Sequence, residues 1–509
     1  MTTVIIPTVG TGSRMNPFTT DLNKALLPYK NKPILSHIIE QFPKDSKFII
    51  PVGYLSEQII DFCNLAYADR DIVFVPISDW ISEKSGTGTT LRKCSFVNKP
   101  FWYVPCDTYF DEPVSATEDC YFIKRVHPAL SGHYAMVDLD QNHRIKEMRF
   151  KERLDSHWWV AFTGLVFIKD FESFFWRLDH SLSSEFVFTI PKNSKTAELN
   201  SWVDFGNPVS YKEALTNSQK FDFTKKNEMT YICNNRVVKW WLDDSIAEKK
   251  IEKISPETRA GTGRYPDNCT RSGNWIGYDL FPGTTMYQHG DPGSFAPLLE
   301  WLDTSIWLPV SKNIHDDCMT FYRDKTLSRI EAFKKKYPDR LKIATVDGVT
   351  VNESVLDNLD WNFLAKESVA GMMHGDLQFD NIIVNSDMEF KLIDWRHEFG
   401  SLTYFGDIYY DLAKLYGGFL VDYSKIKNGE LGMSLRGKEV LLKIPQITNK
   451  SLYINELIGF AMGKGYNLKK IELLVPIIYL NMASLHEPPF DQCLWYYGLK
   501  LIREKLFQS

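Results

Sequence analysis

The 509 residues carry a formal net charge of −5, and 44% of them are apolar and 24% charged. This balance is ordinary for a globular protein in water, and the length predicts at least two domains, because single hydrophobic cores seldom grow to this size. The acidic charge argues against a nucleic-acid partner, which would require a basic surface. No apolar run has the length that crosses a bilayer, so we expect no membrane insertion. Eight cysteines without a C-x-x-C pair favour a cytoplasmic localisation.

Short strand patterns alternate with helical patterns over residues 1–217. We predict strands at 4–7, 48–52, 72–75 and 101–105, and helices at 34–41 and 56–65. This alternation favours an α/β domain with an open, largely parallel sheet and helices on both faces. Ligands of such sheets bind outside the carboxyl ends of the strands. The first functional site is therefore expected in the loops that follow these strands.

A glycine-rich loop follows the first strand directly. It contains Gly10, Gly12, Ser13 and Arg14, and Lys24 comes shortly afterwards. The two glycines let backbone N–H groups approach phosphate oxygens. The two cations supply positive charge for a triphosphate and for the pyrophosphate that leaves it. The loop fits neither the P-loop nor the dinucleotide-binding pattern, so it predicts a nucleotide-binding site of another kind.

This loop closely resembles the signature of the nucleotidyltransferases that activate sugar phosphates and phosphocholine, which have a Rossmann-like domain. Other segments that match this family are residues 52–55, 85–91, 106–108, 151–152 and 202–206. The resemblance implies that Gly86 and Gly88 lie against the base and the sugar, and that Asp107 and Asp204 bind Mg²⁺. It also implies that Lys151 contacts the acceptor phosphate, although a solvated strand lysine is the alternative.

These residues suit one reaction. Asp107 and Asp204 would hold one or two Mg²⁺ ions between the α-phosphate of an NTP and the incoming phosphate of the acceptor. The acceptor phosphate would then attack the α-phosphorus in line, and pyrophosphate would leave with the help of Lys24 and Arg14. The sequence does not indicate which base the NTP carries.

Residues 218–509 follow a different pattern. Strands are predicted at 221–223, 229–233 and 237–241, followed by a charged helix at 243–253 and by long helical stretches at 295–301, 319–336, 408–417 and 454–507. We predict a second, bilobal α+β domain with an N-lobe at about 218–283 and a C-lobe at about 284–509. The boundary lies in a polar segment without a motif.

The most informative motif of the chain lies in this second half. Asp376 and Asn381 have the spacing of a loop in which one residue orients an attacking hydroxyl and the other holds Mg²⁺. Two short apolar runs, 382–384 and 390–393, predict a hairpin that returns Asp394 to the same site. The stretch resembles the small-molecule kinases of the aminoglycoside phosphotransferase and choline kinase type, which share the protein-kinase fold. The resemblance implies ATP as phosphoryl donor, Mg²⁺ at Asn381 and Asp394, and Asp376 as the catalytic residue.

Other parts of the kinase pattern are less complete. Lys239 lies on a predicted strand, like the lysine that grips the phosphates of ATP, and its predicted partner is Glu248, with Glu252 as the alternative. Residues 275–283 resemble the hinge that holds adenine, and Asp411 resembles a residue that stabilises the fold. The absence of Asp-Phe-Gly and Ala-Pro-Glu argues against a protein kinase.

Arg396 bears on the identity of the phosphorylated substrate. It follows Asp394 closely, so a cation next to the acceptor pocket disfavours choline and favours a neutral or acidic sugar or polyol. Pairing of Arg396 with Glu398 or Asp407 is the alternative. Choline or ethanolamine is the second substrate hypothesis.

Together the two halves predict a bifunctional enzyme. The kinase phosphorylates a small hydroxyl metabolite with ATP, and the nucleotidyltransferase converts this phosphate and a second NTP into NDP-X and pyrophosphate for surface polysaccharide or glycoconjugate synthesis. The alternatives are a choline or ethanolamine kinase joined to a phosphocholine cytidylyltransferase, one active domain with a regulatory binding module, and a non-catalytic scaffold. The oligomeric state stays open.

Overall fold

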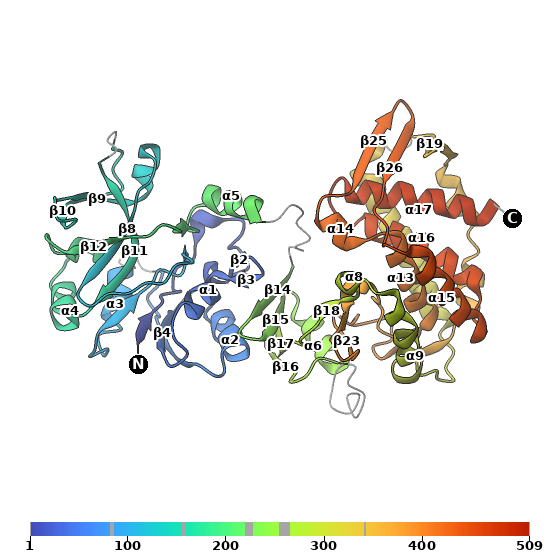
Figure 1. Cartoon of the computed structure of the whole chain (residues 1–509), viewed down its shortest axis with the longest axis horizontal. Helices are drawn as coiled ribbons and strands as arrows, with labels where there is room; N and C mark the ends of the chain where they lie inside the picture. Colours follow the sequence, from blue (N-terminus) through green and yellow to red (C-terminus); the bar gives the residue numbers. More distant parts are fainter. Residues whose placement is uncertain are drawn as a thin grey trace. The chain divides into compact units, whose positions relative to one another are not determined.

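The computed structural model describes residues 2–81, 86–154, 158–218, 227–253, 265–339 and 343–507 (Figure 1). These residues form two compact units. The first holds the described residues up to 218 together with 227–242 and 270–278, and the second holds 243–253, 265–269, 279–339 and 343–507. The strand predicted at 221–223 lies outside the described residues. In the described part of the chain, none of the helices has both the length and the apolar composition of a membrane span.

A nine-stranded mixed sheet forms the centre of the first unit, with β10-β9-β11-β6-β1-β4-β5 as its main order; β8 pairs with β11, and β12 pairs with β8. The strands are β1 (Thr3–Ile5), β4 (Lys47–Val52), β5 (Asp71–Pro76), β6 (Phe101–Tyr103), β8 (Cys120–Lys124), β9 (Ala135–Leu139), β10 (Ile145–Phe150), β11 (Val160–Ile168) and β12 (Lys195–Glu198). The first four run parallel to one another, as predicted, and β11 pairs antiparallel with β6.

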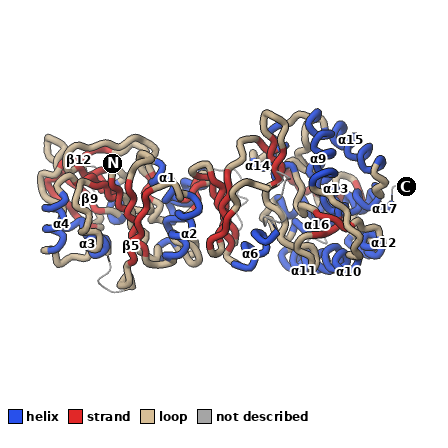
Figure 2. Tube along the Cα trace, turned by 90° about the horizontal axis from the view of Figure 1, so that it is seen from below, coloured by secondary structure: helices blue, strands red, loops and turns tan. Residues whose placement is uncertain are grey.

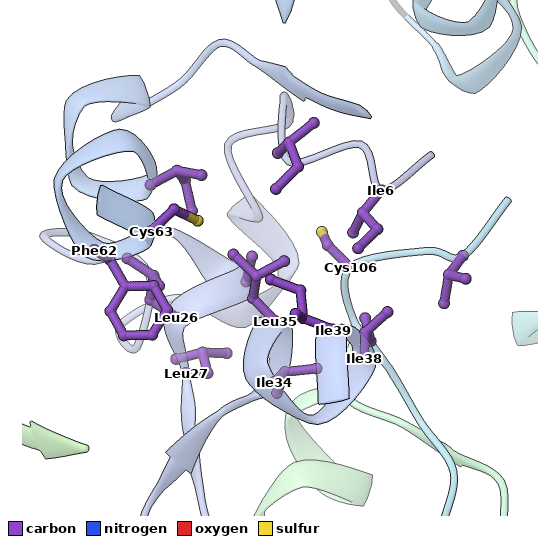
Figure 3. Close-up of a cluster of buried hydrophobic side chains, with 14 of the residues drawn as sticks. Ile6, Leu26, Leu27, Ile34, Leu35, Ile38, Ile39, Phe62, Cys63 and Cys106 are labelled. Carbon is purple, nitrogen blue, oxygen red and sulfur yellow. The ribbon is translucent and has the colours of Figure 1, made fainter. Parts of the chain in front are cut away.

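The parallel strands β1, β4 and β6 are buried on both faces, which explains why they read as continuous apolar runs, whereas β5 at the edge of the sheet is only partly buried. Along β1, Val4 packs into one hydrophobic cluster and Ile5 into the other, because successive side chains of a strand point to opposite faces. The first cluster, part of which Figure 3 shows, includes residues of α1 (Ile34–Glu40) and α2 (Ser56–Ala66). The second includes residues of α3 (Thr87–Arg92) and α4 (Phe171–Asp179). The predicted α/β fold with helices on both faces of the sheet is thus confirmed for the N-terminal region, but the sheet is mixed rather than largely parallel, because β8 to β11 pair antiparallel.

A four-stranded antiparallel sheet also belongs to the first unit. Its strands lie in the order β14 (Glu228–Cys233), β15 (Arg236–Trp241), β17 (Trp275–Asp279), β16 (Thr270–Ser272). Tyr231, Trp240 and Trp275 of this sheet join the hydrophobic cluster of α1 and α2, and the Tyr231 hydroxyl donates a hydrogen bond to the Leu26 carbonyl. The ring of Phe62 on α2 lies 5.6 Å from that of Trp275.

The predicted boundary at 217/218 therefore differs from the division into compact units. The prediction assigned this sheet to the second domain, whereas its large aromatic side chains are buried against the first. A strand pattern indicates a buried face but does not indicate which domain covers that face.

The second unit is predominantly helical (Figure 2). Its helices of ten or more residues are α6 (Asp244–Lys253), α9 (Phe295–Ser305), α11 (Lys325–Lys336), α13 (Ile408–Leu420), α15 (Lys450–Gly463), α16 (Leu468–Ala483) and α17 (Phe490–Phe507). The stretch predicted as helical at 454–507 thus consists of parts of three helices. A π-helical turn, Met319–Asp324, joins α10 (His315–Cys318) directly to α11.

Small sheets complete the second unit. The strands β22 (Ile382–Val384) and β23 (Phe390–Leu392) form the predicted hairpin, and β18 (Thr284–Thr285) pairs with β22. Another pair consists of β21 (Ala370–Met372) and β24 (Phe405–Asp407), directly before α13. A four-stranded sheet contains β19 (Thr345–Val346), β20 (Val349–Thr350), β25 (Gly432–Arg436) and β26 (Glu439–Lys443).

Candidate functional site

A cavity of about 390 Å³ in the first unit brings together most of the residues predicted for the nucleotide site. It lies where the loops after β1 and β6 meet, because parallel strands present their carboxyl ends at the same edge of a sheet. The predicted residues among its lining are Gly10, Arg14, Lys24, Gly86, Asp107, Lys151 and Asp204. Gly12, Ser13 and Gly88 are not part of the lining.

Gly12 shapes the loop rather than the cavity wall. It adopts the left-handed conformation with φ 65° and precedes the 3₁₀ turn Ser13–Met15. A Cβ atom at this position would lie 3.2 Å from Cβ of Lys24 and 3.2 Å from Cγ2 of Thr19. The glycine therefore allows the loop to pack closely over the segment that carries Lys24. Gly88 has a similar packing role, since its N–H donates to the Ser184 carbonyl at 2.7 Å.

We expect Gly12→Ala to destabilise the first unit by about 1–2 kcal/mol, because a side chain in the left-handed region costs this much and the new methyl group also crowds Lys24. Urea unfolding measures the change. Gly10→Ala is the matched control, since a Cβ atom there meets nothing within 4 Å. Equal stability of the two variants would contradict the strain that we assign to Gly12.

Lys24 and Asp107 form an ion pair at the floor of the cavity. Lys24 Nζ lies 2.8 Å from Asp107 Oδ2, and the two side chains are only 20% and 16% exposed. Burial disfavours the charged form of Asp107, but the Lys24 ammonium outweighs this effect and holds the pKa of the carboxyl below its usual range. Asp107 is therefore ionised, and Lys24 stays protonated, at neutral pH.

Asp204 lies beside Asp107 although nearly a hundred residues separate them in the chain. The short strand β13 (Val203–Asp204) pairs antiparallel with β7 (Thr108–Tyr109), which begins directly after Asp107. Both carboxylates flank Gly206, whose N–H donates to Asp204 Oδ1 at 2.8 Å. Burial and the negative charge of Asp107 raise the pKa of Asp204 to about 6.

This carboxylate pair has the chemistry of a Mg²⁺ site. The two acids repel each other, and a divalent cation would relieve that repulsion. Among the described residues, no group of three or more His, Cys, Asp and Glu side chains is arranged to hold a metal ion. The remaining ligands of a cation at Asp107 and Asp204 would therefore have to be phosphate oxygens or water.

The cavity also contains residues that sequence reasoning missed. Trp80, Tyr134 and Glu185 line it. Burial and the neighbouring Asp204 carboxylate raise the pKa of Tyr134, and Thr87 donates a hydrogen bond to Glu185. None of these residues lies in a recognisable motif, so no local signal could have found them. Lys151 lines the cavity but is also exposed, so neither prediction made for it is decided.

The second predicted site lies in the second unit, in the loop before β22. The side-chain nitrogen of Asn381 donates to the backbone carbonyl of Asp376 at 2.8 Å, and this contact does not involve the amide oxygen, which is the atom predicted to bind Mg²⁺. The N–H of Ile393 donates to the Asn381 carbonyl at 3.0 Å. The confirmed hairpin therefore returns Asp394, which has φ 61°, to the base of this loop. Its carboxylate and the Asn381 oxygen are a donor pair that suits Mg²⁺.

Asp376 is held in its ionised form. Its Oδ1 lies 2.7 Å from Nζ of Lys414 on α13, and its side chain is 37% exposed whereas that of Lys414 is 8% exposed. Burial opposes ionisation, but Lys414, followed by Arg396, outweighs it and depresses the pKa of Asp376 far below its usual range. An accessible carboxylate in this state can accept a hydrogen bond from a hydroxyl group.

Asp411 on α13 holds the backbone of the loop that precedes β22 in place through hydrogen bonds. It accepts hydrogen bonds from the N–H groups of His374 and Gly375, both at 2.7 Å, and from Nε1 of Trp307 at 3.1 Å. Burial raises its pKa to about 6. These contacts are those expected of a residue that stabilises the fold.

The buried ring of His374 gives the loop a pH dependence. Burial lowers the pKa of His374 to about 4 from a usual value near 6.5, and Nε2 lies 2.7 Å from the Ile393 carbonyl. The unfolded chain therefore binds a proton at higher pH than the folded chain, so stability is lost as the pH falls from about 6.5 to about 4. We expect the free energy of loop opening to fall by on the order of 2 kcal/mol across this window. Hydrogen exchange of residues 372–381 measures it, and the same slope in His374→Gln would contradict this assignment.

The other residues predicted for the kinase site, Lys239, Glu248 and Arg396, do not all belong to the same compact unit. Lys239 is buried on β15 of the first unit, whereas Glu248 is exposed on α6 of the second, so their pairing stays a prediction. Arg396 does not pair with either alternative partner. Its Nε donates to the Gly375 carbonyl at 3.2 Å. Glu398 pairs with Lys249 and Asp407 with Lys470.

Comparison with known proteins bears on the N-terminal region. No family model matches the chain. The bifunctional protein GlmU of Methanococcus vannielii is 31% identical over 113 residues, which are 22% of this chain and 25% of that protein. The bifunctional protein GlmU of Methanococcus maripaludis is 30% identical over 114 residues, 22% of this chain and 26% of that protein. The chain thus matches about a quarter of the length of these relatives.

Two solved structures match part of the chain with low similarity. A UDP-glucose pyrophosphorylase complexed with UDP-glucose has 16% sequence identity and a TM-score of 0.37, and the match covers 43% of this chain and 98% of that one. The CTP:phosphocholine cytidylyltransferase LicC from Streptococcus pneumoniae has 17% identity and a TM-score of 0.36, over 43% of this chain and 99% of that one. The N-terminal region of the chain resembles nucleotidyltransferases.

Proposed function

We propose that the first unit transfers a nucleotidyl group from an NTP to the phosphate of a small metabolite, with release of pyrophosphate. The convergence of Arg14, Lys24, Asp107 and Asp204 on one cavity carries this proposal. Arg14 and Lys24 provide fixed positive charge for the triphosphate. Mg²⁺ bound by Asp107 and Asp204 would neutralise charge at the α-phosphate and orient the two reactants.

The reaction itself requires positioning more than covalent chemistry. An oxygen of the acceptor phosphate forms a bond to the α-phosphorus while the bond from that phosphorus to the β-phosphate oxygen breaks. Lys24 and Arg14 stabilise the charge of the departing pyrophosphate. Lys151, which also lines the cavity, is our proposed contact for the acceptor phosphate. Gly10 and Gly86, which both line the cavity, would allow the nucleotide to approach the backbone.

We further propose that the chain phosphorylates the same metabolite with ATP, through Asp376, Asn381 and Asp394. The ionised and accessible Asp376 would orient the acceptor hydroxyl and accept its proton as the γ-phosphoryl group moves to the oxygen and ADP leaves. Mg²⁺ at Asn381 and Asp394 would neutralise the phosphates. Lys239, which is buried on a strand of the first unit, stays a prediction as a contact for the phosphates of ATP.

The two activities would be consecutive. The kinase would make X-phosphate from X, and the nucleotidyltransferase would make NDP-X from X-phosphate, a precursor for polysaccharide or glycoconjugate synthesis. Tethering keeps both users of the intermediate at equal abundance and at a high local concentration.

One incubation tests both proposals. The full-length protein receives Mg²⁺, ATP, CTP, UTP and GTP with a panel of sugars, polyols, sugar acids, choline and ethanolamine, and products are identified by mass. Formation of NDP-X from unphosphorylated X would establish both activities, the acceptor and the base. X-phosphate without NDP-X would contradict the first proposal for that acceptor, and a broad panel without any product would favour a non-catalytic scaffold.

A further inference from the structure

Three basic side chains, those of Lys325, Arg396 and Lys414, lie near Asp376 in the second unit, and Arg329 lies near Lys325 and Arg396. Lys325 and Arg329 come from α11, Lys414 from α13, and Arg396 from the loop after β23. The ring of Phe321 joins two of them, since Lys325 Nζ lies 3.4 Å and Arg396 Cζ 5.0 Å from its centroid. We call Lys325, Arg329, Arg396 and Lys414 the cationic cluster.

The cluster contains more positive than negative charge. Asp376 pairs with Lys414. In the described part of the chain, Lys325, Arg329 and Arg396 form no ion pair with a carboxylate. Arg329 donates to the Asn481 carbonyl at 3.0 Å, and Arg396 donates to the Gly375 carbonyl, but carbonyl groups carry no net charge.

Maintaining these cations side by side costs free energy, because like charges repel and each is partly desolvated. The cost is visible at Lys325, whose pKa falls to about 5 through burial and through the charges of Arg396, Arg329 and Lys414. Arg396 likewise contributes to lowering the pKa of Arg329, after burial. An anion placed among these side chains would remove the repulsion and restore the proton on Lys325.

The aromatic platform of the cluster comes from an irregular part of the fold. Phe321 lies in the π-helical turn Met319–Asp324, and its ring centroid lies 4.2 Å from that of Phe399, in a tilted arrangement, and 5.0 Å from that of Tyr410, edge to face. Single π-helical turns cost backbone stability and occur frequently at functional sites. Here the turn places a rigid ring where it contacts Lys325 and Arg396 beside Asp376.

We propose that the hydroxyl substrate of the second unit carries an anionic group, a carboxylate or a phosphate, which binds among Lys325, Arg329 and Arg396 while its hydroxyl faces Asp376. This inference rests on the proposed kinase function and narrows its substrate to an acidic hydroxyl compound. The γ-phosphoryl group forms a bond to the hydroxyl oxygen, the proton passes to Asp376, and ADP leaves. Choline, ethanolamine and amino sugars are disfavoured, because their positive charge would add to the cluster.

Matched acceptors test the charge preference. The full-length protein with Mg–ATP receives glycerol, glycerate and glycerol phosphate as one series, and glucose, glucuronate and glucose 6-phosphate as another, with choline and glucosamine as cations. We expect kcat/KM for an acidic member to exceed that of its neutral analogue by at least about tenfold. The comparison of kcat/KM between the carboxylate and the phosphate member of each series shows which anion the site prefers.

Variants test the location. Lys325→Met and Arg396→Gln are expected to raise the KM for the acidic acceptor by at least about tenfold while the KM for ATP changes by less than about twofold. Arg323→Gln is the matched control, since Arg323 is a neighbouring cation that pairs with Asp324 at 2.7 Å. A rise in the KM for ATP instead would assign the cluster to the nucleotide phosphates and overturn the inference.

The two proposals fail in different ways. Preference for neutral or cationic acceptors would overturn the acidic substrate and leave the kinase function intact. Absence of phosphoryl transfer to every acceptor would overturn the kinase function, and the acidic substrate with it.

Inorganic phosphate gives an independent readout of the proposed anion site. In protein saturated with Mg–ADP, equilibrium dialysis is expected to detect phosphate binding that Arg396→Gln weakens at least about tenfold and Arg323→Gln leaves unchanged. Phosphate binding that is equal in both variants would contradict the site.

Discussion

Replacing Asp107 with alanine is expected to lower nucleotidyl transfer by at least about 10³-fold, since the site loses one of two carboxylates that would hold Mg²⁺. Lys24 also loses the partner that lies 2.8 Å from it, and its ammonium is then free to move within the cavity. Pyrophosphate release from X-phosphate and an NTP measures the effect. Phosphorylation of X by ATP is expected to continue at the rate of the unmodified protein, because Asp376 lies in the other compact unit.

A control for Asp107→Ala is available in the same compact unit. Asp71 pairs loosely with Lys47 at 4.0 Å, is 44% exposed and lies outside the cavity, so Asp71→Ala removes a carboxylate without touching the site. Thermal unfolding with and without Mg²⁺ adds a readout besides activity. Mg²⁺ is expected to stabilise the unmodified protein and Asp71→Ala, but not Asp107→Ala. Stabilisation of all three proteins would show that Mg²⁺ binds elsewhere.

The sequence was sufficient to predict where a candidate site residue lies when that residue follows a strand closely. Gly10 and Arg14 come after β1 and Asp107 after β6, and the carboxyl ends of parallel strands meet, so their convergence follows from the local pattern and one topological rule. The hairpin that returns Asp394 was predictable for the same reason, since two short apolar runs with a turn between them have few other arrangements.

Asp204 was predicted from the family resemblance and not from a local sequence pattern. It reaches Asp107 through the pairing of β13 with β7, two strands of two residues each that carry no periodic signal. Only the resemblance to nucleotidyltransferases singled it out. Its raised pKa depends on proximity to Asp107 and therefore belongs to the tertiary structure.

The sequence could not predict the proximity of residues that meet only through tertiary packing. Lys325 and Lys414 each read as an ordinary lysine on a helix, and nothing local indicates that α11 and α13 bring them to Asp376. The same limit explains why the predicted domain boundary differs from the division into compact units. Strand β14 was predicted correctly, but the burial of Tyr231 against the first unit depends on a contact with Leu26, some two hundred residues away.

Asp376→Asn is expected to lower phosphorylation of X by about 10³- to 10⁴-fold, because the amide cannot accept the hydroxyl proton and no longer forms an ion pair with Lys414. The substitution preserves shape, so the Asn381 hydrogen bond to the backbone of residue 376 is expected to remain. Asp380→Asn is the matched control, since Asp380 lies in the same loop but pairs with Lys427 at 2.8 Å. Transfer of phosphate from ATP to X measures the loss.

Nucleotidyl transfer to X-phosphate supplied from outside separates the competing functions of the second unit. If this unit is a kinase with its own site, Asp376→Asn leaves that rate unchanged. If it is instead a regulatory binding module, the unmodified protein phosphorylates no X, and substitutions around Asp376 change the nucleotidyl transfer rate. Loss of both activities in Asp376→Asn, with folding intact, would contradict two independent sites, because Asp376 and Asp107 lie in different compact units and each has its own cation, Lys414 and Lys24 respectively.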